Sequence, residues 1–195
     1  MNHDTYSDAY IRDILASART IAMVGASANT TRPSFFVFKY LKERGYRVIP
    51  INPGQAGKTL LDEPFRARLA DIDIPIDMVD VFRPPEQAVA VVHEALTLNP
   101  LPKVIWMQLG IRNDEAAAIA EAAGVKVVMN RCPKIEYGRL SAEIGWFGVN
   151  SRTISSRRAP PPTESVQKLS LDRQSIGGGE TPAATRARRE EPGGE

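Results

Sequence analysis

Short apolar runs alternate with helical segments along the first two thirds of the chain, and this alternation constrains the fold more than any other feature. The runs cover residues 20–25, 46–51, 76–82, 103–107 and 125–129. Helical spacing covers residues 7–18, 33–44, 84–98 and 114–123. Alternating strands and helices form βαβ units with right-handed crossovers. The sequence therefore predicts an α/β fold, a doubly wound parallel sheet of about five strands with helices on both faces.

The connection between the second and third predicted strands, residues 55–74, reads as irregular, with a short helix expected over 65–70. The end of the chain differs in composition from the rest. It has little apolar content and contains a run of three prolines and a run of three glycines. Such a segment buries too little surface to offset the entropy lost on ordering. We expect one domain over residues 1–150 and a disordered tail over 151–195.

Charge and cysteine content limit the function classes. The net charge is +2, and residues 152–195 hold eight Lys or Arg and six Asp or Glu, so the predicted domain is neutral overall. A neutral domain gives no reason to expect a nucleic-acid ligand. Cys132 is the single cysteine, and the polar, acidic amino terminus is unlike an export signal. We expect a cytoplasmic protein, without a membrane span because no apolar run is long enough.

The first predicted strand ends in a loop of small residues that leads into the next helix. Gly25 permits a tight turn beside a ligand, while Ala26 and Ser27 keep the approach open. The amino end of the helix directs backbone N–H groups at the same space, which favours a phosphate. Arg32 adds a guanidinium with paired donors, and Ser34 adds a hydroxyl. We expect an anion site here, and an ordinary turn with an exposed arginine is the alternative.

The ends of the other predicted strands supply further candidates, because ligands of doubly wound sheets bind beyond the carboxyl ends of the strands. After the second, third and fourth strands stand Asn52, Pro53 and Lys58, then Phe82 and Arg83, then Gln108 and Gly110. The aromatic ring and the arginine suit an adenine and a phosphate. The amide offers a donor and an acceptor, and the glycine permits close backbone approach. A core phenylalanine, a solvated arginine and a flexible surface lysine are the alternatives.

Two nucleotide-binding motifs are incomplete. The dinucleotide fingerprint requires three glycines after the first strand and an acidic residue at the end of the second. Only Gly25 of the three is present, and the second strand ends in Asn52. The segment 54–59 resembles a phosphate-binding P-loop but has the wrong glycine spacing. Both departures weaken an NAD or ATP interpretation.

Catalytic candidates are few. His93 lies in a predicted helix and His3 near a loose terminus, and neither is linked in sequence to a nucleophile. Arg131 and Lys134 flank Cys132 and would lower its pKa, although a buried structural cysteine is the favoured interpretation. No His or Cys cluster has metal-ligand spacing. We expect no catalytic residue and no metal.

Six segments occur in the order and form of a known family. They are Gly25–Ser27, Arg32–Ser34, Gly45–Pro53, Asp80–Arg83, Trp106–Ile111 and Asn130–Glu136. Over about residues 8–150 the chain resembles the bacterial CoA-binding domain family, small proteins of the YccU type. These are similar to the nucleotide-binding amino-terminal domain of the succinyl-CoA synthetase alpha subunit.

The resemblance implies a Rossmann-like fold with coenzyme A, an acyl-CoA or ADP along the strand ends. It implies phosphate contacts from Gly25, Ser27, Arg32 and Ser34, a second loop bordered by Asn52, Pro53 and Lys58, and Phe82, Arg83, Gln108 and Gly110 beside the adenosine or pantetheine. The synthetases carry their phosphoryl-transfer histidine in a second domain, where this chain has its predicted tail. The expectation is therefore a ligand-binding or regulatory module without catalysis of its own.

Three alternatives stay open at this point. They are an NAD-dependent oxidoreductase, an accessory subunit of an acyl-CoA ligase, and a scaffold that acts through the arginine-rich tail. A protein partner or a homo-oligomer also stays open. The aromatic and glycine residues of segment 143–152 are suited to docking on the sheet edge or on a partner.

Overall fold

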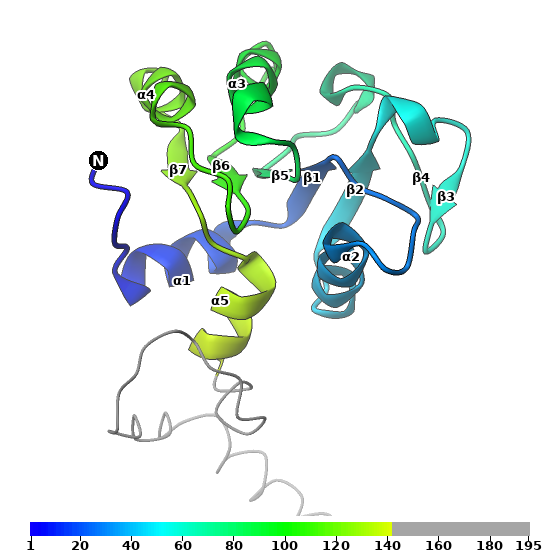
Figure 1. Cartoon of the computed structure of the whole chain (residues 1–195), viewed down its shortest axis with the longest axis horizontal. Helices are drawn as coiled ribbons and strands as arrows, with labels where there is room; N and C mark the ends of the chain where they lie inside the picture. Colours follow the sequence, from blue (N-terminus) through cyan, green and yellow to red (C-terminus); the bar gives the residue numbers. More distant parts are fainter. Residues whose placement is uncertain (142–195) are drawn as a thin grey trace, which may run out of the picture. The chain divides into compact units, whose positions relative to one another are not determined.

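The structure, a computed structural model, describes residues 1–141. The predicted tail and the segment 143–152 lie outside the described residues, so the domain boundary at residue 150 stays a prediction. A five-stranded sheet forms the centre of the described part, and all its neighbouring strands are parallel (Figure 1). From one edge to the other the strands are β2 (Arg47–Ile51), β1 (Thr20–Val24), β5 (Met78–Val81), β6 (Val104–Met107) and β7 (Lys126–Val128). The predicted doubly wound parallel sheet is confirmed.

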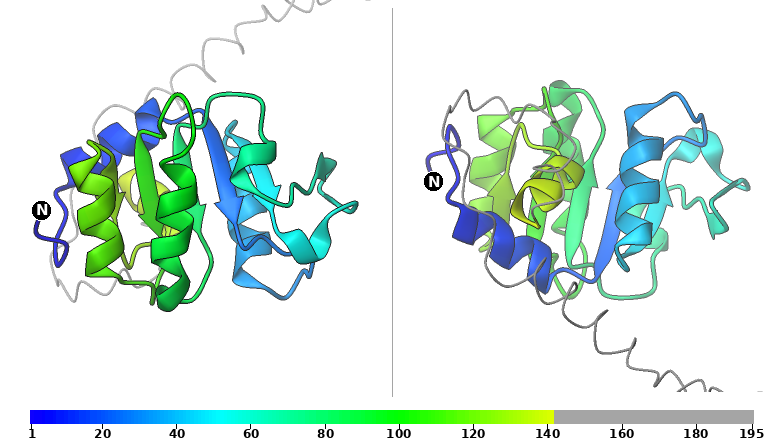
Figure 2. Two further views of the ribbon diagram at one scale, coloured as in Figure 1. Left: turned by 90° about the horizontal axis from the view of Figure 1, so that it is seen from above. Right: turned by 90° about the horizontal axis from the view of Figure 1, so that it is seen from below.

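Helices cover both faces of this sheet (Figure 2). One face carries α1 (Asp8–Ser17), α2 (Pro33–Glu43) and α5 (Pro133–Leu140), and the other carries α3 (Ala88–Ala95) and α4 (Asp114–Ala122). Successive strand side chains point to opposite faces, so β1 sends Met23 into the first layer and Val24 into the second. Burial on both faces explains why the strands read as continuous apolar runs.

Local sequence explains where several helices begin. The Ser7 hydroxyl accepts from the Tyr10 N–H at 3.2 Å at the start of α1. The Asn113 side chain does the same for the Ala116 N–H at 2.8 Å at the start of α4. Proline stands in the first turn of α2 and of α5, where the missing N–H has no helical partner to lose.

The strand order places a switch point beside β1. From β1 the chain moves outward to β2, and it then crosses back to form β5 on the other side of β1. The chain leaves β1 on one side and returns on the other, so no crossover runs over the carboxyl ends of β1 and β5. In this class of sheet, ligands bind in the crevice that this divergence opens.

The connection between β2 and β5 is more ordered than the sequence suggested. It holds two short 3-10 turns, Pro53–Gln55 and Leu69–Asp71, and a small hairpin of β3 (Thr59–Leu60) and β4 (Glu63–Pro64). The helix expected over residues 65–70 was wrong, because Arg66 donates to the Pro50 carbonyl and accepts from the Asn52 N–H, both at 2.9 Å. These bonds hold the chain extended beside β2 until the turn at Leu69.

The helix α5 was not expected from the sequence. It follows β7 after the short connection 129–132 and packs beside α1, where Arg139 pairs with Asp8 at 2.8 Å. The same guanidinium pairs with the buried Glu136 at 2.8 Å. Within residues 1–141, no helix combines the length and the apolar character needed to cross a bilayer.

Candidate functional site

The floor of the site is the close approach of two backbones at the switch point. Gly25 directly follows β1 and has φ +89°, and a Cβ placed on it would lie 2.5 Å from the Phe82 carbonyl oxygen. The Gly25 N–H donates to the Ile51 carbonyl at 2.9 Å, and the Phe82 N–H donates to the Val24 carbonyl at 2.8 Å. Only glycine fits both the backbone angle and the space. The end of β1 is therefore held between the ends of β2 and β5.

The loop after β1 leads directly into the uncapped amino end of α2. Ala26 is buried, and the Ser27 hydroxyl accepts from the Asn29 N–H at 3.2 Å. Arg32 stands at the N-cap of α2 with its side chain exposed, and Ser34 is 4% exposed. The first turn of α2 has neither a side-chain cap nor an acidic residue. Its N–H groups and the guanidinium therefore present positive charge without a local counter-charge.

Asn52 joins the loops that follow three different strands. Its Nδ2 donates to the Ala26 carbonyl at 2.8 Å, and its Oδ1 accepts from the Gly54 N–H at 3.1 Å. The half-buried Arg83 approaches the same oxygen, with 3.5 Å between Nη2 and Oδ1. An acidic residue here, as in the dinucleotide fingerprint, would have no N–H for the Ala26 carbonyl. The structure thus brings together two residues that the sequence offered separately.

Gln108 is turned inward rather than toward the strand ends. It is 5% exposed, and its Nε2 lies 2.8 Å and 3.1 Å from the two carboxyl oxygens of the fully buried Asp80. Burial raises the pKa of Asp80 to about 8, and the hydrogen bond from Gln108 opposes this rise. At neutral pH the Asp80 carboxyl is mainly protonated. Gln108 thus has its amide nitrogen committed to Asp80, and a ligand contact from it stays a prediction.

Asp80 is the residue that sequence reasoning missed as a member of the site. The available signal was an aspartate inside the apolar run 76–82, on a strand that both neighbours cover. An acid at such a position is rare unless it is paired or neutral.

The loops after β6 and β7 are joined to each other. The Gly110 N–H donates to the Asn130 side-chain oxygen at 2.8 Å, and the Asn130 N–H donates to the Ile111 carbonyl at 3.0 Å. A Cβ on Gly110 would meet no atom within 4 Å, although its φ of +80° favours glycine. Glycine is used here for its backbone angle and not for a close approach.

The remaining candidates lie on the loop after β2. Pro53 opens the 3-10 turn that Asn52 caps, and it is exposed. Lys58 lies at the base of the β3–β4 hairpin, where its carbonyl accepts from the Phe65 N–H at 3.0 Å and its side chain is exposed. Contact of either residue with a ligand stays a prediction.

Cys132 lies behind the site at the N-cap of α5 and is 7% exposed. Burial raises the pKa of its thiol, and the nearby Asp80 acts in the same direction. Lys134 lowers that pKa, as its position in the sequence suggested, but burial outweighs it. The thiol is therefore neutral at physiological pH, which is the behaviour of a structural cysteine.

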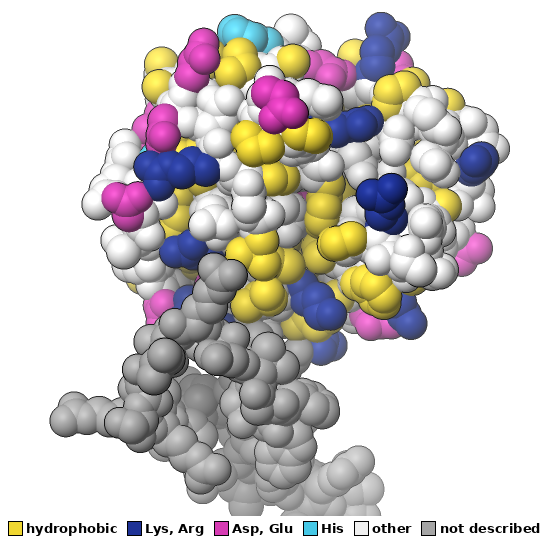
Figure 3. Space-filling model, in the orientation of Figure 1, with side chains coloured by type: hydrophobic (Ala, Val, Ile, Leu, Met, Phe, Trp, Pro, Cys, Tyr) yellow, Lys and Arg dark blue, Asp and Glu magenta, His cyan; other side chains and the backbone are white. Residues whose placement is uncertain are grey.

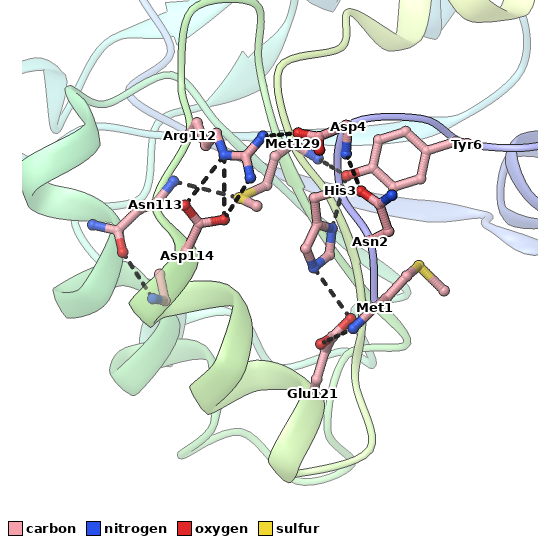
Figure 4. Close-up of polar contacts among 11 residues, drawn as sticks. Met1, Asn2, His3, Asp4, Tyr6, Arg112, Asn113, Asp114, Glu121 and Met129 are labelled. Carbon is pink, nitrogen blue, oxygen red and sulfur yellow. Dashed lines mark hydrogen bonds and ion pairs between the residues drawn. The ribbon is translucent and has the colours of Figure 1, made fainter.

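The amino-terminal segment braces the loops after β6 and β7 (Figure 4). The Tyr6 hydroxyl accepts from the Met129 N–H at 2.8 Å and contacts His3 Nδ1 at 2.9 Å. Arg112 lies 2.6 Å from the Asp4 carboxylate. The expectation of a loose terminus around His3 was wrong, because this histidine is 8% exposed.

The face with the loops after the strands is turned to the viewer in Figure 3. Hydrophobic side chains run across its middle, and Lys and Arg side chains flank them. A mixed surface of this kind suits a ligand with anionic and apolar parts. A cavity of about 290 Å³ lies elsewhere, at the amino ends of β1 and β2.

Fold and site together define a Rossmann-like α/β domain with the uncapped amino end of α2 and the exposed Arg32 at the switch point. The model of the CoA binding domain family matches residues 19–138, and the chain belongs to this family. The uncharacterized protein YneT of Bacillus subtilis (strain 168) is 36% identical over 135 residues, which is 67% of this chain and 94% of YneT. The family resemblance predicted from the sequence is confirmed.

Solved structures agree with this assignment. A Thermus thermophilus protein, cell-free ID.343, has a TM-score of 0.66 and 41% identity, and the match covers 69% of this chain and 99% of that protein. The dinucleotide-forming acetyl-coenzyme A synthetase 1 of Ca. Korarchaeum cryptofilum shares the fold alone, with a TM-score of 0.52 and 19% identity. That match covers 61% of this chain and 28% of the synthetase.

Proposed function

We propose that this chain binds coenzyme A, with the diphosphate at the amino end of α2 and the adenosine beside the loop after β5. The observation that carries the proposal is the family match over residues 19–138, which includes the loops after all five strands of the sheet. The uncapped first turn of α2 and the exposed Arg32 supply donors and charge for a diphosphate. Phe82 and Arg83, which follow β5, supply an aromatic surface and a second cation.

We further propose that the chain works as a cytoplasmic ligand-binding or regulatory module. Two groups that the sequence offered for catalysis are engaged or neutral, since His3 contacts Tyr6 and the buried Cys132 keeps its proton. A free thiol of this kind fits a reducing compartment. Bound coenzyme A would then act through the loops that it contacts rather than through a reaction.

The test is a calorimetric titration of the full chain with CoA, dephospho-CoA, ADP and NAD in parallel. We expect saturable CoA binding that Arg32→Gln weakens about tenfold, because one charged hydrogen-bond donor to phosphate is lost. Arg47→Gln is the matched control, because Arg47 is exposed at the amino end of β2. This substitution removes the same charge as Arg32→Gln. It should change the affinity by less than about twofold.

NAD binding without CoA binding would refute the proposal and favour a hydride-transfer enzyme. Equal losses from Arg32→Gln and Arg47→Gln would leave CoA binding in place but remove the diphosphate from the α2 terminus. Binding of ADP with the same affinity as CoA would show that the pantetheine arm contributes nothing to recognition.

A further inference from the structure

A cavity of about 290 Å³ opens at the edge of the sheet opposite the proposed CoA site. It lies between the end of α1, the end of α2 and the end of α5, beside the first residues of β1 and β2. Its lining residues are Arg12, Leu15, Ala16, Arg19, Arg44, Gly45, Tyr46, Tyr137, Leu140 and Ser141. This volume is close to the lower end of the range for small-molecule sites.

The charge of this cavity is one-sided. Three arginines from three separate parts of the chain line it, and the described lining includes no carboxylate. Two acids that interact with lining residues, Asp8 and Asp77, are themselves paired with other cations. Asp8 pairs with Arg139 at 2.8 Å, and Asp77 pairs with Lys103 at 2.7 Å while accepting the Arg19 backbone N–H at 2.8 Å. Arg12 and Arg19 are exposed residues of this lining, and a guanidinium group is suited to an anion.

The aromatic part of the cavity lining is held in place by contacts with its neighbours. The Tyr46 hydroxyl donates to the Leu15 carbonyl at 2.7 Å, and the Tyr46 and Tyr137 rings meet edge to face with their centroids 6.2 Å apart. The Arg44 guanidinium lies over the Tyr40 ring, 4.8 Å from its centroid. Burial raises the pKa of Tyr46 to about 12, so this phenol adds no negative charge at neutral pH.

We propose that this cavity binds a small organic anion, a carboxylate or phosphate group carried on a single aromatic ring. The anion would lie against Arg12 and Arg19, and the ring would pack against the contacting pair of Tyr46 and Tyr137. Arginine supplies paired donors for either anionic group, and the tyrosine rings favour an edge-to-face aromatic partner. The site is separate from the proposed CoA site and does not depend on it.

The test is a calorimetric titration of the full chain with phenyl phosphate, benzoate and benzyl alcohol in parallel. We expect saturable binding of at least one anion, and no saturation with the neutral alcohol up to about 10 mM. Arg12→Gln and Arg19→Gln should each weaken anion binding about tenfold. Arg47→Gln is the matched control, because Arg47 follows Tyr46 directly but does not line the cavity. It should change the affinity less than about twofold.

Urea unfolding of the same variants shows whether they fold, and a parallel CoA titration separates this proposal from the proposed function. Unchanged unfolding together with selective loss of phenyl phosphate or benzoate binding supports the cavity site. Three results overturn it: no anion saturates below about 10 mM, benzyl alcohol binds as well as the anions, or Arg47→Gln weakens binding as much as Arg12→Gln. Each of these holds whether or not CoA binds.

Discussion

Replacing Gly25 by alanine tests the claim that two backbones meet at the floor of the site. The new Cβ would lie 2.5 Å from the Phe82 carbonyl oxygen and 2.9 Å from its carbonyl carbon. Ordinary contact begins near 3.4 Å, so the ends of β1 and β5 must separate by about 0.9 Å. The obstacle is backbone and not the end of a flexible side chain, so rotamer changes give no relief.

Three contributions add to the loss of stability. An L-residue at φ +89° costs about 1–2 kcal/mol. Forcing the strands apart costs about 1–3 kcal/mol, as overpacking does elsewhere. The same movement lengthens the 2.8 Å bond from the Phe82 N–H to the Val24 carbonyl, which is worth about 1 kcal/mol. We expect Gly25→Ala to lower the free energy of unfolding by about 4 kcal/mol.

The matched control is Gly45→Ala, measured by urea unfolding alongside Gly25→Ala. Gly45 has nearly the same backbone angle, φ +86°, but a Cβ there would meet no atom within 4 Å. Gly45→Ala should therefore lower the free energy of unfolding only by the backbone strain, about 1–2 kcal/mol. If the two variants lose the same free energy of unfolding within about 0.5 kcal/mol, the close approach contributes nothing and the reasoning fails.

Three further predictions concern the residues around this floor. The pKa of Asp80 is raised from 3.8 to about 8 in the folded chain. Below about pH 4 the carboxyl is therefore protonated in both states and leaves the free energy of unfolding unchanged, whereas it lowers that free energy progressively as the pH rises toward 8. Wild type should therefore lose stability relative to Asp80→Asn across that window, by at most about 1.4 kcal/mol per pH unit, and a pH-independent difference would contradict the burial argument. Asn52→Asp should weaken CoA binding about tenfold or more in calorimetry, because it removes the N–H bonded to Ala26 and adds negative charge beside the proposed phosphates, whereas unchanged affinity would exclude Asn52 from the site. Cys132 should react with iodoacetamide at neutral pH about 100-fold more slowly in the folded chain than in urea, and equal rates would show that the thiol is accessible.

The sequence predicted the sheet because its strands are buried on both faces. A strand such as Thr20–Val24 therefore reads as one apolar run, without the alternating polar residues of a strand that is exposed on one face, and Gly25 marks its end. The helix α5 escaped prediction because its apolar spacing is weak and it contains Gly138. It is held by tertiary contacts, among them the pairs of Arg139 with Asp8 and Glu136. Tertiary contacts of this kind cannot be predicted from the local sequence pattern.

The site was predictable as a set of strand ends and not as a set of contacts. Parallel strands bring their carboxyl ends to one edge, so Gly25, Asn52 and Phe82 had to be near neighbours. The bond between Asn52 and Ala26 depends on how two loops curve over 26 residues of sequence separation. The inward turn of Gln108 depends on a buried acid, Asp80, in the adjacent strand. Neither follows from residue type or spacing.

The way in which the loops are joined adds no negative side-chain charge at neutral pH to the proposed CoA site. Side-chain amides make the cross-links, since Asn52 bonds the loops after β1 and β2, Asn130 bonds the loop after β6, and Gln108 bonds Asp80. An amide can donate and accept without carrying charge, whereas a carboxylate in the same place would add a negative charge. The acid among these cross-links, Asp80, is kept mainly protonated by burial at neutral pH. The positive charges of Arg32 and Arg83 are therefore left uncompensated by the groups that hold the loops together, and they remain available to a phosphate-bearing ligand.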